Sequence, residues 1–135
     1  MVEDARILLV DDERLVRRSM EKTLLRAGFD VDTADNALNG LALFEEAIED
    51  DEERPFDLAI LDLNMPSFDG TVDANAGLHL LSKLLEIDQD LPVIVLTAFD
   101  EVERAKRAVK LGARAYFVKG REAELLEIVK DILGE

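Results

Sequence analysis

The sequence predicts an α/β fold: a doubly wound, five-stranded parallel sheet with helices on both faces. Two observations support it. Short apolar runs rich in branched residues alternate along the chain with longer segments whose apolar residues have helical spacing. Apart from residues 29–34, the short runs are also apolar throughout, as in strands that are buried on both faces of a sheet. Alternation of strands and helices favours parallel pairing through right-handed crossovers.

The predicted strands are the five short apolar runs, at residues 7–10, 29–34, 58–61, 93–96 and 115–118. Pro92 precedes the fourth run, a position where a proline does not interrupt the hydrogen bonding of a strand. A helix is predicted after each strand, and Gly28 and Gly112 mark the ends of the first and fourth helices. The apolar positions that define the helices are Leu15, Val16, Met20 and Leu24; Ala37, Leu41, Phe44 and Ile48; Leu78, Leu81 and Leu85; Val102, Ala105 and Val109; and Leu125, Ile128, Val129 and Ile132.

Length and composition indicate one globular domain over residues 1–135, with a core at about 5–133. The net charge of −15, from 31 acidic and 16 basic residues, disfavours binding to nucleic acids and to anionic lipids. The chain has no cysteine and therefore no disulfide framework. We expect a soluble, cytoplasmic protein, because the start lacks a secretory signal pattern and no apolar run approaches the roughly 18 residues of a membrane span.

Chemically active residues follow four of the predicted strands. Asp11 and Asp12 follow the first strand, Asp62 ends the third, Thr97 ends the fourth and Lys119 ends the fifth. In folds of this class, ligands bind beyond the carboxyl ends of the strands, so we expect these side chains to converge. Unrelated loop residues would not be expected to form such a coherent set of three carboxylates, a hydroxyl and an ammonium.

Carboxylates that lie close together repel one another unless a cation neutralises them. Mg²⁺ is the natural candidate, since it favours oxygen ligands and is usually held by one or two carboxylates together with a phosphate oxygen. With the metal drawing charge from a phosphate, Asp62 can act as a nucleophile and form an acyl phosphate. Lys119 would then stabilise the charge on the transferred group.

The motifs at the strand ends resemble the receiver domain of bacterial two-component response regulators. They are Asp11-Asp12, Asp62-Leu63-Asn64-Met65-Pro66, Thr97-Ala98 and Tyr116-Phe117-Val118-Lys119. The resemblance extends from about Ala5 to Leu133 and implies a flavodoxin-like strand order 2-1-3-4-5. It further implies that Asp62 is the phosphoacceptor and that the Mg²⁺ ligands are Asp11, Asp12, Asp62 and the backbone carbonyl of Asn64.

The family pattern also implies a conformational switch. Thr97 would bond a phosphoryl oxygen and move inward, Ala98 would leave room for the phosphate, and Lys119 would pair with it. Tyr116 would change rotamer with Thr97 and carry the signal to the face formed by the fourth helix, the fifth strand and the fifth helix. Taken alone, Tyr116 has a simpler interpretation as a core residue, and Asp11 and Asp12 as caps of the first helix.

The resemblance implies a histidine kinase or phosphotransfer protein as phosphodonor, and an output domain or partner, or a second copy in a homodimer, at the switch face. Basic residues cluster on the first helix, including Arg17 and Arg18, and on the fourth, including Arg104. These clusters have two interpretations, as docking patches or as solvated faces. The only histidine, His79, shares a polar helical stripe and is assigned no role.

Two features depart from the family pattern. Gly120 stands where the family usually has a proline, often after a cis peptide; a cis bond before glycine costs about 3 kcal/mol, so we expect a trans bond there. The stretch from Ser67 to Ala76 is longer than usual by about half a dozen residues. We interpret it as a tolerated insertion, although a loop carrying Asp69 could also cover Asp62 and alter the lifetime of the phosphate.

The function predicted is therefore a signalling switch rather than an enzyme: Asp62 accepts a phosphoryl group and loses it slowly by hydrolysis. One alternative is a receiver-like adaptor whose output needs no phosphate. The other is an aspartate-nucleophile phosphohydrolase. Those enzymes typically place the nucleophile after the first strand with a second Asp two residues on, whereas here the corresponding residue is Asn64.

Overall fold

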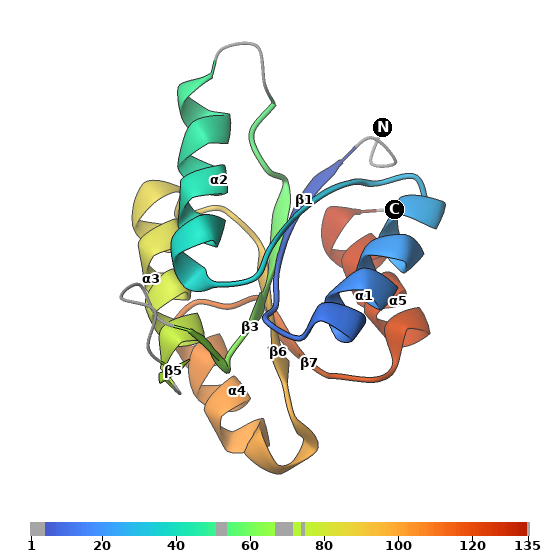
Figure 1. Ribbon diagram of the computed structural model, residues 1–135, viewed down its shortest axis with the longest axis vertical. Coiled ribbons are helices and arrows are strands. Elements are labelled where there is room, and N and C mark those ends of the chain that lie inside the picture. The colour runs from blue at the N-terminus through green and yellow to red at the C-terminus, as the bar shows by residue number, and fades with distance from the viewer. Residues whose placement is uncertain (1–4, 51–53, 67–71, 74, 135) are drawn as a thin grey trace.

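The structure, a computed structural model, describes residues 5–50, 54–66, 72–73 and 75–134. Five parallel strands form one sheet, and in space their order is β2-β1-β3-β6-β7 (Figure 1). Numbered along the chain within this sheet alone, this is the predicted order 2-1-3-4-5. The strands are β1 (Arg6–Val10), β2 (Asp30–Ala34), β3 (Leu58–Asp62), β6 (Val93–Thr97) and β7 (Ala115–Val118).

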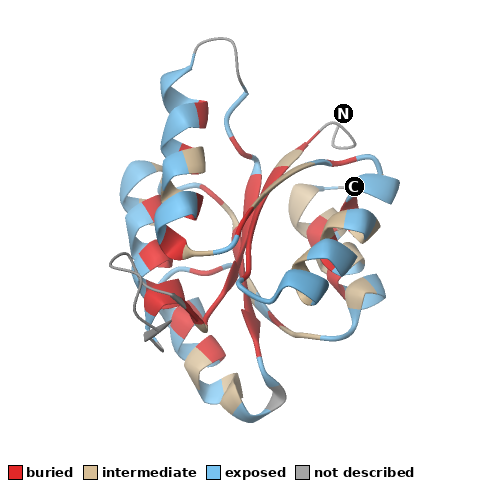
Figure 2. Cartoon of the chain, viewed as in Figure 1, coloured by how far each residue is buried: buried red, intermediate tan, exposed pale blue. Residues whose placement is uncertain are grey.

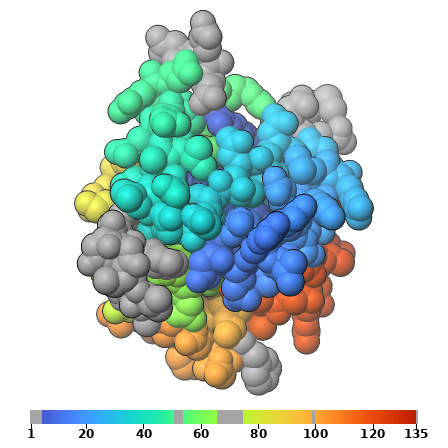
Figure 3. All heavy atoms as spheres, in the orientation of Figure 1, coloured from blue at the N-terminus to red at the C-terminus, as the bar shows by residue number. Residues whose placement is uncertain are grey.

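Helices cover both faces of this sheet, as Figure 1 shows. One face is covered by α1 (Arg14–Arg26) and α5 (Glu122–Leu133), and the other by α2 (Ala37–Glu49), α3 (Ala76–Ile87) and α4 (Val102–Lys110). In the space-filling view, α1 and α2 both lie on the face toward the viewer (Figure 3). No described helix has the length and apolar character needed to cross a membrane.

The sheet separates two apolar cores because successive side chains of a strand point to opposite faces. In β3, Leu58 and Ile60 pack on the side of α1 and α5, whereas Ala59 and Leu61 pack on the side of α2, α3 and α4. Every residue of β3 and β6 is buried, which Figure 2 shows as the red centre of the molecule. The uniformly apolar runs thus mark strands that are covered on both faces.

The stretch after β3 differs from the simple loop that was predicted. Met65–Pro66 (β4) and Val72–Asp73 (β5) form a short antiparallel pair, and α3 begins at Ala76. Both interpretations of this stretch, a tolerated insertion or a cover over Asp62, fall largely on residues 67–71 and 74, which lie outside the described residues, as does Asp69.

Candidate functional site

The carboxyl ends of four strands meet at one edge of the sheet and bring the predicted site residues together. Asp11 follows β1 directly, Asp62 and Thr97 are the last residues of β3 and β6, and Lys119 follows β7. Asp11, Asp62 and Thr97 are buried polar residues, with exposed fractions of 0, 2 and 1%. The backbone joins these ends, since the Lys119 amide donates to the Thr97 carbonyl at 3.1 Å. The predicted convergence is thus present.

Four carboxylates form a compact cluster at this edge. Asp11, Asp12, Glu13 and Asp62 each contribute an oxygen, and these oxygens all lie within 4.8 Å of one another. Asp11 is held in place by the amide of Glu13, which donates to its Oδ1 atom at 2.9 Å. Glu13 was not among the predicted site residues, although it directly follows Asp11 and Asp12 and extends the acidic run.

The Lys119 ammonium lies among these carboxylates. Its Nζ atom is 2.9 Å from Asp62 Oδ2, 2.8 Å from Glu13 Oε1 and 3.4 Å from Asp11. Burial alone would lower the pKa of Lys119. The hydrogen bonds to Glu13 and Asp62 and the charges of Asp62 and Asp11 outweigh it, so the pKa of Lys119 is raised overall. The lysine therefore remains a cation at this site.

A single lysine does not offset the burial of these acids. Burial, together with the charge of Asp11, raises the pKa of Asp62 to about 8, although Lys119 and the amide of Asn64 act to lower it. Burial likewise raises the pKa of Asp11. Asp11 Oδ2 is buried and accepts no hydrogen bond from any described residue, and the Lys119 ammonium lies 3.4 Å from it. A buried carboxylate oxygen without a hydrogen bond, beside three further carboxylates, fits a hard divalent cation such as Mg²⁺.

The Thr97 hydroxyl forms its hydrogen bonds with backbone carbonyls. Its Oγ1 atom lies 3.2 Å from the Ala98 carbonyl and 3.1 Å from the Glu101 carbonyl. Both carbonyls belong to the segment that joins β6 to α4, which includes a short 3₁₀ helix at Phe99–Glu101. The hydroxyl therefore bonds to the β6–α4 connection rather than to Asp62.

Asn64, two residues after Asp62, connects the site to α4. Its backbone amide donates to Asp62 Oδ1 at 3.1 Å, while its side-chain amide donates to Glu101 and accepts from Arg104. Glu101 and Arg104 had not been predicted as site residues. Their contacts with Asn64 span 37 and 40 residues of sequence, a separation at which local patterns carry no signal.

The remaining predicted residues lie at the margins of the site. Tyr116 is paired with Val95 in the sheet and is 36% exposed, so it lies at the surface of β7 rather than in the core. Gly120 has φ of 106°, a left-handed conformation that favours glycine. The described residues contain no cis peptide bond, so the bond before Gly120 is trans, as expected. His79 is exposed.

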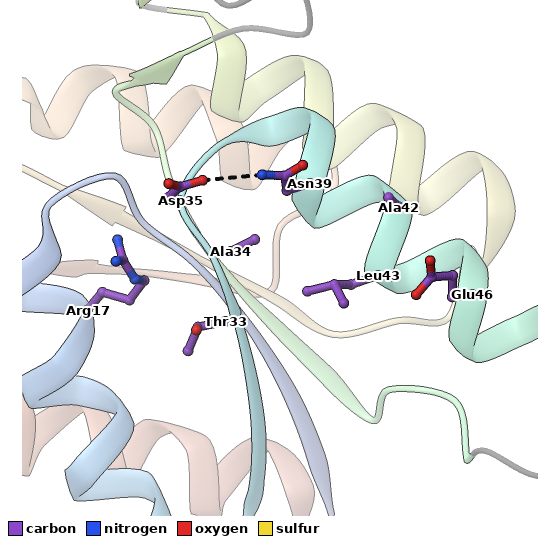
Figure 4. A pocket seen from close by; sticks show the side chains of 8 residues that line it. All are labelled: Arg17, Thr33, Ala34, Asp35, Asn39, Ala42, Leu43 and Glu46. Atoms are coloured by element: carbon purple, nitrogen blue, oxygen red, sulfur yellow. Dashed lines mark hydrogen bonds between the residues drawn. The ribbon is translucent and has the colours of Figure 1, made fainter.

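The basic residues of α1 are not equivalent. Arg17 donates to the Asp11 carbonyl at 2.8 Å, whereas Arg18 is exposed. Arg17 also lines a pocket of about 440 Å³ that it shares with residues of β2 and α2. Figure 4 shows Arg17 on the α1 side of this pocket, with Asp35 bonded to Asn39 at the start of α2. Arg17 is therefore part of the framework around Asp11.

Known proteins share this fold and sequence pattern. The model of the response regulator receiver domain matches residues 7–130. The chain is 37% identical to the response regulator protein FleR of Pseudomonas aeruginosa, over 97% of this chain and 25% of FleR. It is 30% identical to the chemotaxis protein CheY of Treponema pallidum, over 95% of this chain and 82% of CheY.

A receiver domain from Clostridium thermocellum superposes with a TM-score of 0.80 at 29% identity, covering 96% of this chain and 93% of that one. The chain spans between a quarter and a half of the length of the first curated relatives that it matches. The match to the family model covers most of the chain and includes every strand end at which the polar residues converge. This chain therefore belongs to the response regulator receiver domain family, the signalling switches of two-component systems.

Proposed function

We propose that Asp62 is the phosphoacceptor of this receiver domain and takes its phosphoryl group from a histidine kinase or phosphotransfer protein. The observation that carries the proposal is the Lys119 ammonium 2.9 Å from the buried Asp62 carboxylate, within a cluster of four acids. A carboxylate nucleophile and a cation are thus already paired where a transferred phosphoryl group would lie.

Asp11, Asp12, Asp62 and the backbone carbonyl of Asn64 would hold a Mg²⁺ ion. When bound, the ion would draw negative charge from the phosphate and keep the Asp62 carboxylate ionised. The Asp11 Oδ2 atom, which accepts no hydrogen bond from a described residue, and the raised pKa of Asp62 both support a cation at this position. Glu13 lies in the same cluster and is bonded to Lys119.

The transfer itself requires few protein groups. An oxygen of Asp62 attacks phosphorus, and the bond from phosphorus to the donor histidine nitrogen breaks. That nitrogen keeps the electron pair, and because the other ring nitrogen carries a proton, the donor leaves as neutral imidazole. Lys119 would pair with the phosphoryl oxygens as it now pairs with the acids. Water would later attack the same phosphorus and regenerate the Asp62 carboxylate, which makes the domain a switch with slow self-dephosphorylation.

Phosphorylation would bias the structure through Thr97. Its hydroxyl now lies by the carbonyls of Ala98 and Glu101, and a phosphoryl oxygen near Asp62 would compete for it. The exposed Tyr116 ring would then turn inward behind Thr97. This would change the face formed by α4, β7 and α5, on which an output domain, a separate partner or a second copy of the chain would dock.

Treatment with acetyl phosphate and Mg²⁺ tests the function. We expect intact-mass spectrometry to show one added phosphoryl group on the wild-type chain and none on Asp62→Asn. Asp90→Asn, which removes an exposed acid outside the cluster, should be phosphorylated like the wild type. A gain in mass that persists in Asp62→Asn would place the acceptor elsewhere. No gain in the wild type would favour the adaptor, and rapid turnover of a generic phosphoester would favour the hydrolase.

Docking of the phosphodonor on α1 is tested at Arg18, because Arg17 also supports Asp11. We expect Arg18→Glu to slow transfer from the cognate histidine kinase several-fold at low salt, while leaving phosphorylation by acetyl phosphate unchanged. Arg107→Glu, a charge reversal at an exposed position of α4, is the matched control. Equal transfer rates for the wild type and Arg18→Glu would contradict docking of the phosphodonor on α1.

A further inference from the structure

Three polar side chains form a hydrogen-bonded group between the end of β3 and the start of α4. Arg104 Nη1 donates to Asn64 Oδ1 at 2.9 Å and to Glu101 Oε2 at 3.2 Å, and Asn64 Nδ2 donates to the same Glu101 carboxylate. The side chains of Arg104 and Glu101 are 25% and 31% exposed, so the group is partly shielded from water. Both ends of the Asn64 side-chain amide are therefore occupied.

This group adjoins both reactive side chains of the site. The Asn64 backbone amide donates to Asp62 Oδ1, and the Glu101 carbonyl lies 3.1 Å from the Thr97 hydroxyl. The hydrogen bonds of Arg104 go to Asn64 and Glu101 rather than to Asp62, so any influence of Arg104 on Asp62 passes through Asn64 or Glu101. Its Nη2 atom is buried and has no hydrogen-bond partner among the described residues. A side chain placed only for stability would avoid that cost.

We propose that Arg104 is a positioning residue that slows loss of the phosphoryl group by holding the Asn64 side chain in place. The proposal rests on the phosphoacceptor function of Asp62. During hydrolysis the oxygen of a water attacks phosphorus, the bond between phosphorus and the Asp62 oxygen breaks, and the proton passes to solvent. The products are the Asp62 carboxylate and inorganic phosphate.

Loss of Arg104 should raise the rate of hydrolysis, because Arg104 holds the oxygen of the Asn64 side-chain amide. A water that attacks phosphorus is oriented best by a fixed neighbouring acceptor. Asn64 lies two residues after Asp62 and its backbone amide bonds Asp62 Oδ1, so its side chain starts beside the position of the phosphoryl group, but its Oδ1 atom is held by Arg104. Without Arg104, this oxygen can turn toward the attacking water and accept a hydrogen bond from it, while Glu101 still holds the Nδ2 end of the amide. Removal of Arg104 therefore accelerates hydrolysis.

The experiment measures the rate of phosphate loss after acetyl phosphate is removed. Arg104→Ala should lose phosphate several-fold faster than the wild type, Arg104→Lys should restore part of the lifetime, and Arg107→Ala, on the exposed side of α4, should match the wild type. In an Asn64→Ala background, Arg104→Ala should have no further effect. This non-additivity separates positioning of Asn64 from a general loss of stability.

Two results would overturn the inference: equal lifetimes for the wild type and Arg104→Ala, or an effect of Arg104→Ala that persists undiminished without the Asn64 side chain. If Arg104→Ala does not fold, Glu101→Gln provides the same test, since the Glu101 carboxylate anchors both Arg104 and Asn64. Failure of the wild type to gain a phosphoryl group would instead contradict the phosphoacceptor function itself, so the two failures are distinguishable.

Discussion

Gly77→Ala is expected to destabilise the protein by about 3 kcal/mol and to prevent phosphorylation of Asp62. A Cβ atom at Gly77 would lie 2.4 Å from the Asp62 carbonyl oxygen and 2.6 Å from Leu63 Cα. Both are backbone atoms at the end of β3, so neither can rotate away as a side chain could. The first turn of α3 would have to move, and the bond from the Gly77 amide to the Leu63 carbonyl at 3.3 Å would be lost.

Gly40→Ala is the matched control, because Gly40 is also a buried helical glycine. There the added Cβ would meet Val10 Cγ2 at 2.8 Å, a side-chain atom rather than backbone, so relief needs only the buried Val10 side chain to shift and no backbone movement. Alanine also has a higher helix propensity than glycine, by about 1 kcal/mol, which offsets part of the crowding. Urea unfolding should therefore show a much smaller loss for Gly40→Ala. Equal losses for the two variants would contradict the close approach of α3 to Asp62.

The central strands β1, β3 and β6 were predictable from sequence because their uniformly apolar runs are buried on both faces, whereas the edge strands β2 and β7 are partly exposed. The prediction erred by one residue where a helix end competed with a strand. Phe29 was expected to begin the second strand, but its amide donates to the Leu24 carbonyl at 3.2 Å. Gly28, with φ of 97°, allows the chain to end α1 with this hydrogen bond. β2 therefore begins at Asp30, one residue later than predicted.

The convergence of Asp11, Asp62, Thr97 and Lys119 was predictable because parallel strands end at a common edge. The side chains that contact the site residues were not predictable. Lys119 reaches Glu13 across 106 residues, and Arg104 reaches Asn64 across 40. Such contacts depend on the tertiary arrangement and leave no periodic pattern in the sequence. The pairing of β4 with β5 was missed for a different reason, since two-residue strands are too short to show alternation.

Lys119→Met should lower the free energy of unfolding by about 3 kcal/mol at pH 8 in the absence of divalent cations. Lys119 contacts the carboxylates of Asp62, Glu13 and Asp11, and the side chains of Asp62 and Asp11 are almost fully buried. Without the ammonium, these two acids lose their nearest cation. Lys106→Met is the control, because Lys106 pairs with a single exposed carboxylate at 3.5 Å and its loss should change stability little.

The pH dependence of the stability lost in Lys119→Met distinguishes a charge effect of Lys119 from a packing effect. The pKa of Asp62 is raised to about 8, and removal of Lys119 raises it further, because Lys119 acts to lower it. A carboxyl group with a raised pKa holds its proton in the folded protein but not in the unfolded chain, so stability falls as the pH rises from about 4 through the folded pKa. The deficit of Lys119→Met should therefore be smaller at pH 5 than at pH 8.

Divalent cations provide the complementary measurement. If the carboxylates at this edge form a Mg²⁺ site, added Mg²⁺ should stabilise Lys119→Met more than the wild type, because the ion supplies the charge that the variant lacks. Lys119→Arg, which retains a cation, should lose less stability than Lys119→Met. A deficit that changes with neither pH nor Mg²⁺ would mean that Lys119 acts through its aliphatic stem rather than its charge. The electrostatic account of the site would then be wrong, even if phosphorylation of Asp62 were observed.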